Sequence, residues 1–214
     1  MTGFIEPLAQ ESTPSIIAHK LRQAIGHGEL KPGAQLSEAD LARKLGVSRG
    51  PLREGMQRLT QEGLLVSIRH RGLFVIEMTH EDIRDMYLAR EAIERAAAHK
   101  ILENDHTAAG DTLMAVVDEM AAATTPAEVG ELDIRFHELL VQLAHSPRLT
   151  RMHPTFITET RMCIHALEES YSRADVRADE HRALAKAIRS GDRELTDRLL
   201  CGHMDDAIHR LIPN

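Results

Sequence analysis

From residue 79 to its end the sequence carries helix signals, whereas strand signals are confined to a short stretch before that point. Capping patterns and helix-starting prolines recur at Thr79, near Thr107, and at Thr125, Pro147, Ser172 and after Gly191. Six starts at this spacing predict six helices, and their short connections favour an antiparallel bundle. Hydrophobic residues make up 43% of the chain but aromatic residues only 3%, so the bundle core must be mainly aliphatic.

The first third of the chain mixes helices with a hairpin. A helical pattern over residues 15–30 is followed by a Pro-Gly turn. Ser37 is placed to cap a short helix that stops at Gly46, and Ser48 is placed to cap a longer one. Two β-rich runs then flank residues 69–72, which is typical of a β-hairpin.

Two helices joined by a tight turn and followed by a hairpin are the parts of a winged helix-turn-helix. The expected fold is therefore mostly α. We expect a winged helix-turn-helix DNA-binding domain over residues 1–78, followed by an antiparallel six-helix bundle over residues 79–214.

Charge is distributed unevenly along the chain. The net charge is −7, which taken as a whole argues against a nucleic-acid partner. Between residues 43 and 71, however, there are seven basic residues and only two acidic ones. A local basic surface is a better guide to a nucleic-acid partner than the global sum, although a solvated surface carries the same charges.

The second predicted helix of the N-terminal domain has arginines on the side away from its apolar stripe. Arg49 and Arg53 lie four residues apart, so both can point into a major groove, where a guanidinium matches O6 and N7 of guanine. Ser48 and the free N–H groups of the first turn suit a phosphate. Arg71 lies at the hairpin tip, where a wing meets a minor groove or a DNA backbone. Each arginine taken alone is also compatible with an ordinary surface residue.

Residues 15–76 resemble the DNA-binding domain of the GntR family of bacterial transcription regulators, above all in the stretch LSEADLARKLGVSRGPLREGMQRLTQEGLLVSIRHRGLFV. The resemblance implies that the recognition-helix residues that contact DNA are Ser48, Arg49, Gly50 and Arg53. It also implies that Gly72 lies at the wing tip, where the geometry of the turn explains the glycine better than a ligand does.

Two positions depart from the family pattern. Ala39 stands where the family often has an arginine, which removes one expected phosphate contact. Gly55 stands where the family usually has alanine, which should cost roughly 1 kcal/mol of helix stability. The second departure concerns rigidity more than specificity.

The stretch DIRFHELL places a carboxylate and an imidazole on the apolar face of a predicted helix. Asp133 and His137 lie four residues apart, close enough for one ion to bind both. His181 and His203 lie on apolar faces of two later helices. A carboxylate inside a helical core needs a cation or several hydrogen bonds, and three imidazoles plus a carboxylate suit Zn²⁺, Ni²⁺ or Mn²⁺. The spacing alone leaves open that each histidine is a hydrogen-bonded core residue.

Residues 80–212 resemble the all-helical effector-binding domain of the FadR branch of the GntR family, called FCD, especially in EHRALAKAIRSGDRELTDRLLCGHM. In many members an Asp-x-x-x-His on one helix joins two later histidines around a metal. By that resemblance Asp133, His137, His181 and His203 hold a divalent ion, with zinc expected ahead of nickel or manganese.

The same resemblance implies partners. It implies a homodimer that binds a near-palindromic operator in double-stranded DNA, usually as a repressor, and an organic or sugar acid as effector. Arg90 matches a family arginine that faces the pocket and suits a carboxylate, and Arg161 is a second candidate. Either arginine is also compatible with a salt bridge between helices.

Two alternatives remain open. An open metal site can activate water, so a metal-dependent hydrolase with a DNA-binding head is one of them. The sequence has no HExxH pattern and no second acid or base placed for catalysis near the metal candidates, so we expect no enzymatic activity. In the other alternative the metal is purely structural and the effector binds elsewhere.

Location follows from what the sequence lacks. No apolar run is long enough to span a bilayer, and the N-terminus shows no signal-peptide pattern, so we expect no membrane partner. Cys163 and Cys201 make no disulfide framework and indicate buried thiols in a reducing compartment. We therefore expect the cytoplasm.

Overall fold

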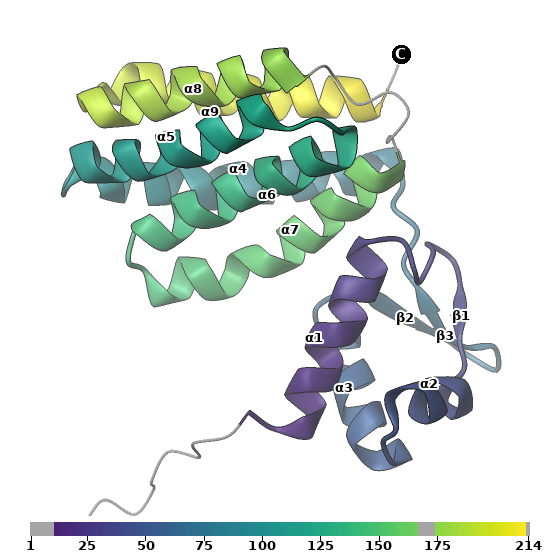
Figure 1. Cartoon of the computed structure of the whole chain (residues 1–214). Helices are drawn as coiled ribbons and strands as arrows, with labels where there is room; N and C mark the ends of the chain where they lie inside the picture. The colour runs from purple at the N-terminus through teal and green to yellow at the C-terminus, as the bar shows by residue number, and fades with distance from the viewer. Residues whose placement is uncertain (1–10, 167–173, 213–214) are drawn as a thin grey trace, which may run out of the picture. The chain divides into compact units, whose positions relative to one another are not determined.

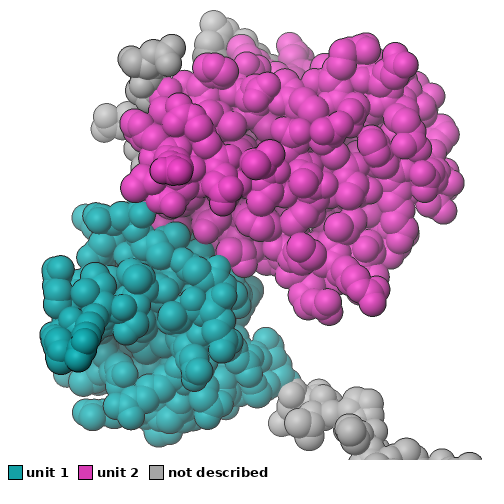
Figure 2. Space-filling view, turned by 180° about the vertical axis from the view of Figure 1, so that it is seen from behind, with its two compact units in different colours: residues 1–77 teal, residues 78–214 magenta. Residues whose placement is uncertain are grey.

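A computed structural model describes residues 11–166 and 174–212 of the chain. The chain divides into two compact units, residues 1–77 (unit 1) and residues 78–214 (unit 2), coloured separately in Figure 2. Among the described residues, strands occur only in unit 1, where they form one small sheet. The mostly-α fold predicted from the sequence is confirmed.

Unit 1 is a winged helix-turn-helix (Figure 1). Its elements in chain order are α1 (Thr13–Gly26), β1 (Gln35–Leu36), α2 (Glu38–Leu45), α3 (Arg49–Gln61), β2 (Leu65–Ile68) and β3 (Gly72–Val75). Strand β3 pairs antiparallel with both β1 and β2, and β2 and β3 form the predicted hairpin. Strand β1 was not predicted, because two residues are too few to show the alternation that identifies a strand.

The helix caps of unit 1 lie where the sequence predicts them. The Ser37 hydroxyl accepts a hydrogen bond from the N–H of Asp40 and starts α2, which ends at Gly46 in a left-handed conformation. Ser48 stands at the cap position of α3, but its hydroxyl makes no capping hydrogen bond. The exposed Ser48 hydroxyl is therefore available for another partner.

Helix α3 packs closely against α1 at Gly55. A Cβ at this position would lie 2.8 Å from Cγ2 of Ile17 and 3.1 Å from the carbonyl oxygen of Pro14. Ile17 is buried, so its methyl group has little room to move. This close approach explains why residue 55 is a glycine. The tight packing of α1 against α3 offsets the loss of helix propensity.

Unit 2 is a bundle of six helices in the described part of the chain (Figure 1). They are α4 (His80–Leu102), α5 (His106–Ala122), α6 (Pro126–Leu143), α7 (Pro147–Ala166), α8 (Ala174–Ser190) and α9 (Arg193–Leu211). Every predicted helix is present, although the cap predicted at Ser172 lies outside the described residues.

Local caps explain where these helices begin. Thr79 with Asp82, and Thr125 with Glu128, form the two reciprocal capping boxes that the sequence predicts at the starts of α4 and α6. Helix α5 begins slightly earlier than predicted, because Asp105 rather than Thr107 serves as its cap.

The core of unit 2 combines an aliphatic shell with buried charge. Side chains such as Leu113, Phe136 and Leu140 are fully buried and close the bundle. Arg90 and Glu94 are buried to the same degree, with exposed fractions of 1% and 0%. In the described part of the chain, no helix has the length and apolar character needed to cross a bilayer.

Candidate functional site

The first candidate surface lies on helix α3. Arg49, Gly50 and Arg53 are all exposed, as the predicted recognition helix requires. Arg53 donates from Nε to Glu38 Oε2 on α2 at 2.8 Å, in an ion pair whose two side chains are 63% and 40% exposed. An ion pair this exposed contributes little stability, so DNA phosphates or bases can compete for Arg53.

The hairpin between β2 and β3 carries the second group of exposed charges. Arg71 is exposed beside the tip, and its guanidinium carbon lies 5.3 Å above the ring of Phe74. His70 and Gly72 adopt left-handed backbone conformations with φ of 61° and 106°, and the value at Gly72 is one that only glycine adopts easily. Gln35 on β1 donates to the carbonyl oxygen of Arg71 and so holds the tip to the sheet.

The second candidate site lies within unit 2 and contains the four predicted metal ligands. Asp133 and His137 come from α6, His181 from α8 and His203 from α9. One ligand atom from each lies within 4.8 Å of the others, and their exposed fractions run from 0% to 9%. The structure therefore brings together four residues that span 70 positions of the chain. Their nitrogen and oxygen donors suit a divalent ion.

Hydrogen bonds on the far side of the rings decide which nitrogens face the centre. His181 lies with Nδ1 2.8 Å from the carbonyl oxygen of Arg177, which can only accept, so in the neutral ring the proton is on Nδ1. Its Nε2 then presents a lone pair to Asp133 Oδ1 at 3.3 Å. Both atoms are buried without a hydrogen-bond partner. A lone pair facing a carboxylate is repulsive unless a cation lies between them, so the site fits a metal ion.

The protonation of the site favours the same conclusion. Burial lowers the pKa of His137 to about 3, so this imidazole is neutral at physiological pH. Burial also raises the pKa of Asp133, but the charge of Arg177, 3.8 Å away, acts in the opposite direction, and the pKa lies well below the usual value. A neutral imidazole and an ionised carboxylate are the forms that bind metals.

A buried carboxylate that the sequence analysis missed lies directly behind His137. Glu94 on α4 accepts from His137 Nδ1 at 2.6 Å, from Arg90 Nε at 2.6 Å and from His153 Nε2 at 3.1 Å. Burial raises the pKa of Glu94, but Arg90 and His137 together hold it well below the usual value. The four-residue spacing of Arg90 and Glu94 on one helix face was a usable signal, whereas nothing in the sequence linked either residue to His153.

The two predicted effector arginines differ in their surroundings. Arg90 is buried, pairs with Glu94 and donates to Thr160, and its Nη2 has no hydrogen-bond partner. Arg161 donates from Nε and Nη2 to Glu131 at 2.9 and 3.1 Å. Arg90 therefore faces the buried network, whereas Arg161 is engaged in an ion pair between α7 and α6.

A third arginine, Arg177 on α8, was not predicted. Its side chain is 5% exposed, and Nη1 lies 3.8 Å from Asp133 Oδ1 and 3.5 Å from Glu180 Oε2. Arg177 precedes His181 by one helical turn, so the helical repeat alone places it on the same face.

Solvent approaches the four-residue cluster between α8 and α9. A hollow of about 160 Å³ there is lined by residues that include His181, His203, Glu180, Arg198 and Gly202. His203 is the most exposed of the four predicted ligands, at 9%. Access from water to the cluster therefore leads past His203.

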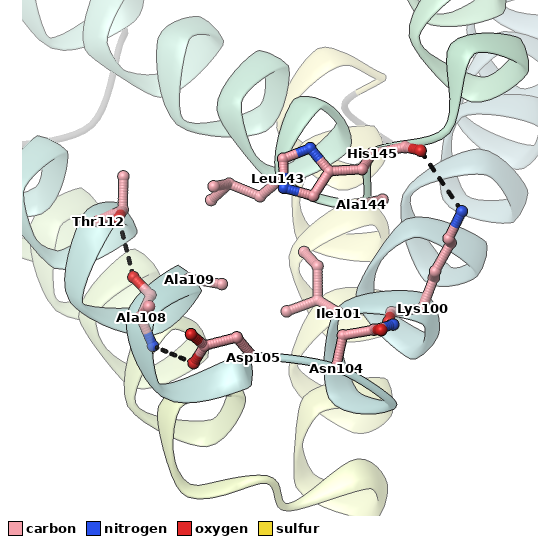
Figure 3. A pocket seen from close by; sticks show the side chains of 10 residues that line it. All are labelled: Lys100, Ile101, Asn104, Asp105, Ala108, Ala109, Thr112, Leu143, Ala144 and His145. Atoms are coloured by element: carbon pink, nitrogen blue, oxygen red, sulfur yellow. Dashed lines mark hydrogen bonds between the residues drawn. The ribbon is translucent and has the colours of Figure 1, made fainter.

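A separate hollow of about 260 Å³ lies at the ends of α4, α5 and α6 (Figure 3). Figure 3 shows Lys100 directed at the carbonyl oxygen of His145, 3.5 Å away, and Asp105 bonded to the N–H of Ala108. These polar groups serve the helix ends, and we assign no ligand to this hollow.

Comparison with known proteins agrees with this architecture. Residues 15–75 match the gntR family of bacterial regulatory proteins, and residues 85–206 match the FCD domain. A transcriptional regulator from an unstable DNA locus of Streptomyces ambofaciens is 32% identical over 86% of this chain and 79% of its own length. The gluconate operon transcriptional repressor of Bacillus licheniformis is 28% identical over 93% of this chain and 85% of its own.

A solved structure shows the same arrangement of elements. A GntR transcriptional regulator from Rhodococcus sp. RHA1 has a TM-score of 0.78 and 29% identity, covering 94% of this chain and 98% of its own. These relatives are transcription regulators, so the expectation that the chain is not an enzyme is confirmed. The chain belongs to the GntR family of bacterial transcription regulators and carries the FCD domain of the FadR branch.

Proposed function

We propose that this regulator binds a near-palindromic operator as a homodimer, and that its helical unit senses a small carboxylate at a divalent metal ion. DNA binding is the activity of the family, and the regulator would act in the cytoplasm, where the DNA lies. Residues 1–78 would then serve as the DNA-binding domain, and residues 79–214 as the effector-binding and dimerisation domain. Repression is the direction favoured, since the gluconate operon relative is a repressor.

The operator contacts rest on exposed groups of unit 1. Arg49 and Arg53 would enter the major groove, and Ser48 with the backbone at Gly50 would hold a phosphate. The free hydroxyl of Ser48 supports this role, because it caps nothing in the protein. Arg71 would meet the DNA backbone or minor groove from the wing, with Gly72 providing the turn.

The metal proposal rests on one observation above all. Asp133 Oδ1 and His181 Nε2 lie 3.3 Å apart, buried, each without a hydrogen-bond partner. A divalent ion held by Asp133, His137, His181 and His203 would give both of these atoms a partner. Zinc fits this nitrogen-rich set best, and nickel or manganese would keep further positions for the oxygens of an anion.

A carboxylate is the proposed effector because it suits both charges of the site. The metal would bind its oxygens, and the free Nη2 of Arg90 would donate to it. Gluconate is a sugar acid, and the presence of a gluconate operon repressor among the relatives supports this class of ligand. Arg161 is the weaker candidate, since Glu131 already accepts two of its N–H groups.

One observation favours a second candidate, in which the metal is structural. Nε of Arg90 is already taken by Glu94 and Nη1 by Thr160, which leaves the guanidinium a single free donor. A regulator with a structural metal would bind its effector elsewhere.

Titration separates the two candidates. Gluconate and a panel of other small carboxylates would be titrated into the metal-free and zinc-loaded protein, and operator binding followed by fluorescence anisotropy. Sensing at the metal predicts carboxylate binding in the loaded form only, with a change in operator affinity of roughly 5- to 150-fold. Equal carboxylate affinity in both forms would identify the metal as structural.

A further inference from the structure

The face of α4 that turns into the bundle carries two charged residues one helical turn apart. Arg90 and Glu94 are both buried, and the carboxylate of Glu94 contacts a predicted metal ligand from a different helix. We propose that Glu94 is the positioning residue of the metal centre, which holds His137 in the ring orientation and tautomer that present Nε2 to the metal. This inference rests on the proposed function, since it assumes an ion at the four-residue cluster.

The geometry assigns a different task to each oxygen of Glu94. Oε2 accepts from His137 Nδ1 at 2.6 Å. Oε1 accepts from Arg90 Nε at 2.6 Å and from His153 Nε2 at 3.1 Å. One carboxylate therefore joins α4 to a ligand on α6 and to a histidine on α7.

The direction of these hydrogen bonds follows from the donors present. A carboxylate beside a buried guanidinium is ionised and can only accept, so the proton shared with His137 belongs to Nδ1. In the neutral ring Nε2 then carries a lone pair, which can accept a hydrogen bond from Nε2 of His203, 3.0 Å away, when no ion is bound. Two imidazole nitrogens converge in this way where a cation would bind both. Without Glu94, His137 would be free to take the other tautomer and to rotate.

A purely structural role explains less of this arrangement. Burying an arginine with a carboxylate commonly costs as much as the attraction returns, so the pair alone gives no reason for the burial. The same helix offers a comparison in Glu91, which pairs with Arg95 at the same four-residue spacing. Those side chains are 23% and 38% exposed, and Glu91 contacts none of the four predicted ligands among the interactions described for this part of the chain. Of these two pairs on α4, the buried one is tied to the cluster.

The bonds around Glu94 also connect the metal to the rest of the bundle. Arg90 extends the network to Thr160 on α7 through Nη1 at 3.2 Å. The orientation of His137 is thus set jointly by α4 and α7, and a carboxylate that binds Nη2 of Arg90 would act on the residue that holds a metal ligand.

The test compares Glu94→Gln with Glu91→Gln in the full chain. Zinc affinity is measured by competition with a chelator of known affinity, and the visible spectrum of the cobalt-loaded protein reports the ligand geometry. Loss of an outer partner of this kind typically weakens metal binding roughly 10- to 100-fold. We expect that loss and an altered cobalt spectrum for Glu94→Gln, and neither for Glu91→Gln. Identical affinity and spectrum in the two variants would overturn the proposal.

A measurement on the unmodified chain covers the case in which Glu94→Gln fails to fold. NMR of the zinc-loaded protein with ¹⁵N-labelled histidine reports which nitrogen binds the metal. The proposal predicts that His137 binds through Nε2 and keeps a slowly exchanging proton on Nδ1, and coordination through Nδ1 would overturn it. If the unmodified chain binds no zinc, the metal centre itself is wrong. If it binds zinc and His137 uses Nδ1, only the role of Glu94 is wrong.

Discussion

The two units handle charge in opposite ways. In unit 1 the residues proposed to contact DNA are exposed, and Arg53 has one exposed ion-pair partner. In unit 2 the charged residues of the site are buried and surrounded by partners, as Arg90 is by Glu94 and Thr160. The contrast agrees with the kind of partner proposed for each unit.

A polyanion as large as DNA can be bound only at the surface, where arginine keeps its hydration until the partner arrives. A small ion or effector can be enclosed, and enclosure in a medium of low dielectric strengthens each electrostatic contact while it makes each unpaired charge costly. The exposed arginines of unit 1 should therefore respond to mutation through DNA affinity alone, whereas the buried charges of unit 2 should respond through both stability and ligand binding.

The largest effect is expected at the buried carboxylate. Asp133→Asn keeps the shape of the side chain but removes the charge that faces His181. In the wild-type protein, zinc at 100 times its dissociation constant should raise the free energy of unfolding by about 2.7 kcal/mol. We expect this gain to vanish in the variant, as measured by thermal unfolding with and without zinc.

The matched control for Asp133→Asn is Asp118→Asn, which removes a 66%-exposed carboxylate paired with Arg182. It should leave the zinc effect unchanged. A variant Asp133→Asn that still gains the full stabilisation would show that Asp133 does not bind the ion.

The next largest effect is expected in operator affinity, at the exposed arginines of α3. Arg49→Ala is expected to cost about 1–3 kcal/mol of operator binding, roughly 5- to 150-fold, because a base contact is lost. Arg53→Ala should act similarly, and together they should abolish discrimination between operator and random duplex. Fluorescence anisotropy with both duplexes measures this.

Arg58→Ala is the control on the same helix, since Arg58 donates to Ser15 on α1 rather than projecting from the recognition face. It should preserve discrimination. If Arg49→Ala retains it as well, the assignment of α3 to the major groove is wrong.

A smaller effect is expected where the helices of unit 1 meet. Gly55→Ala gains about 1 kcal/mol of helix propensity, but the new methyl group overlaps the buried Ile17, and overpacking typically costs about 1–3 kcal/mol. The free energy of unfolding of the variant should therefore be lower than that of the wild type by roughly 1 kcal/mol. Gly50→Ala on the same helix, where a Cβ would meet no atom within 4 Å, should not be destabilised. Stabilisation by Gly55→Ala would show that α1 can move away.

The smallest effect concerns the pH dependence of unit 2. Burial, with the charges of Asp82 and Asp85, raises the pKa of Glu159 to about 7. The folded chain then holds this proton more tightly than the unfolded chain, so Glu159 favours folding at low pH and loses that contribution as pH rises through about 7. Glu159→Gln should flatten the fall in stability between about pH 4.5 and 7, by an amount of order 1 kcal/mol once solvent screening is allowed for. Parallel stability curves in wild type and variant would contradict this.

The sequence predicted the elements of both units well, because their signals are local. Capping boxes such as Thr79 with Asp82, and the cap at Ser37, involve residues three positions apart and need no knowledge of the fold. The four metal candidates were also predictable, since a polar residue on an apolar helix face is visible in the periodicity and the family pattern supplied the grouping.

The outer partners of the site could not be predicted in the same way. Helical periodicity gave no clear apolar face for His153, and it does not say which of the neighbouring helices Glu94 or His153 will meet. Their contact depends on how α4 and α7 pack, and 59 residues separate them in the chain. Gly55 likewise predicted only a loss of helix stability, because its contact with α1 depends on how the two helices pack.

The central claim is that unit 2 holds a divalent ion at Asp133, His137, His181 and His203. Its most direct test is elemental analysis of the full chain purified without chelator and dialysed against metal-free buffer. We expect one equivalent of a divalent transition metal per chain. Protein that is folded, that binds its operator and that contains no such metal, even after incubation with zinc, would contradict it.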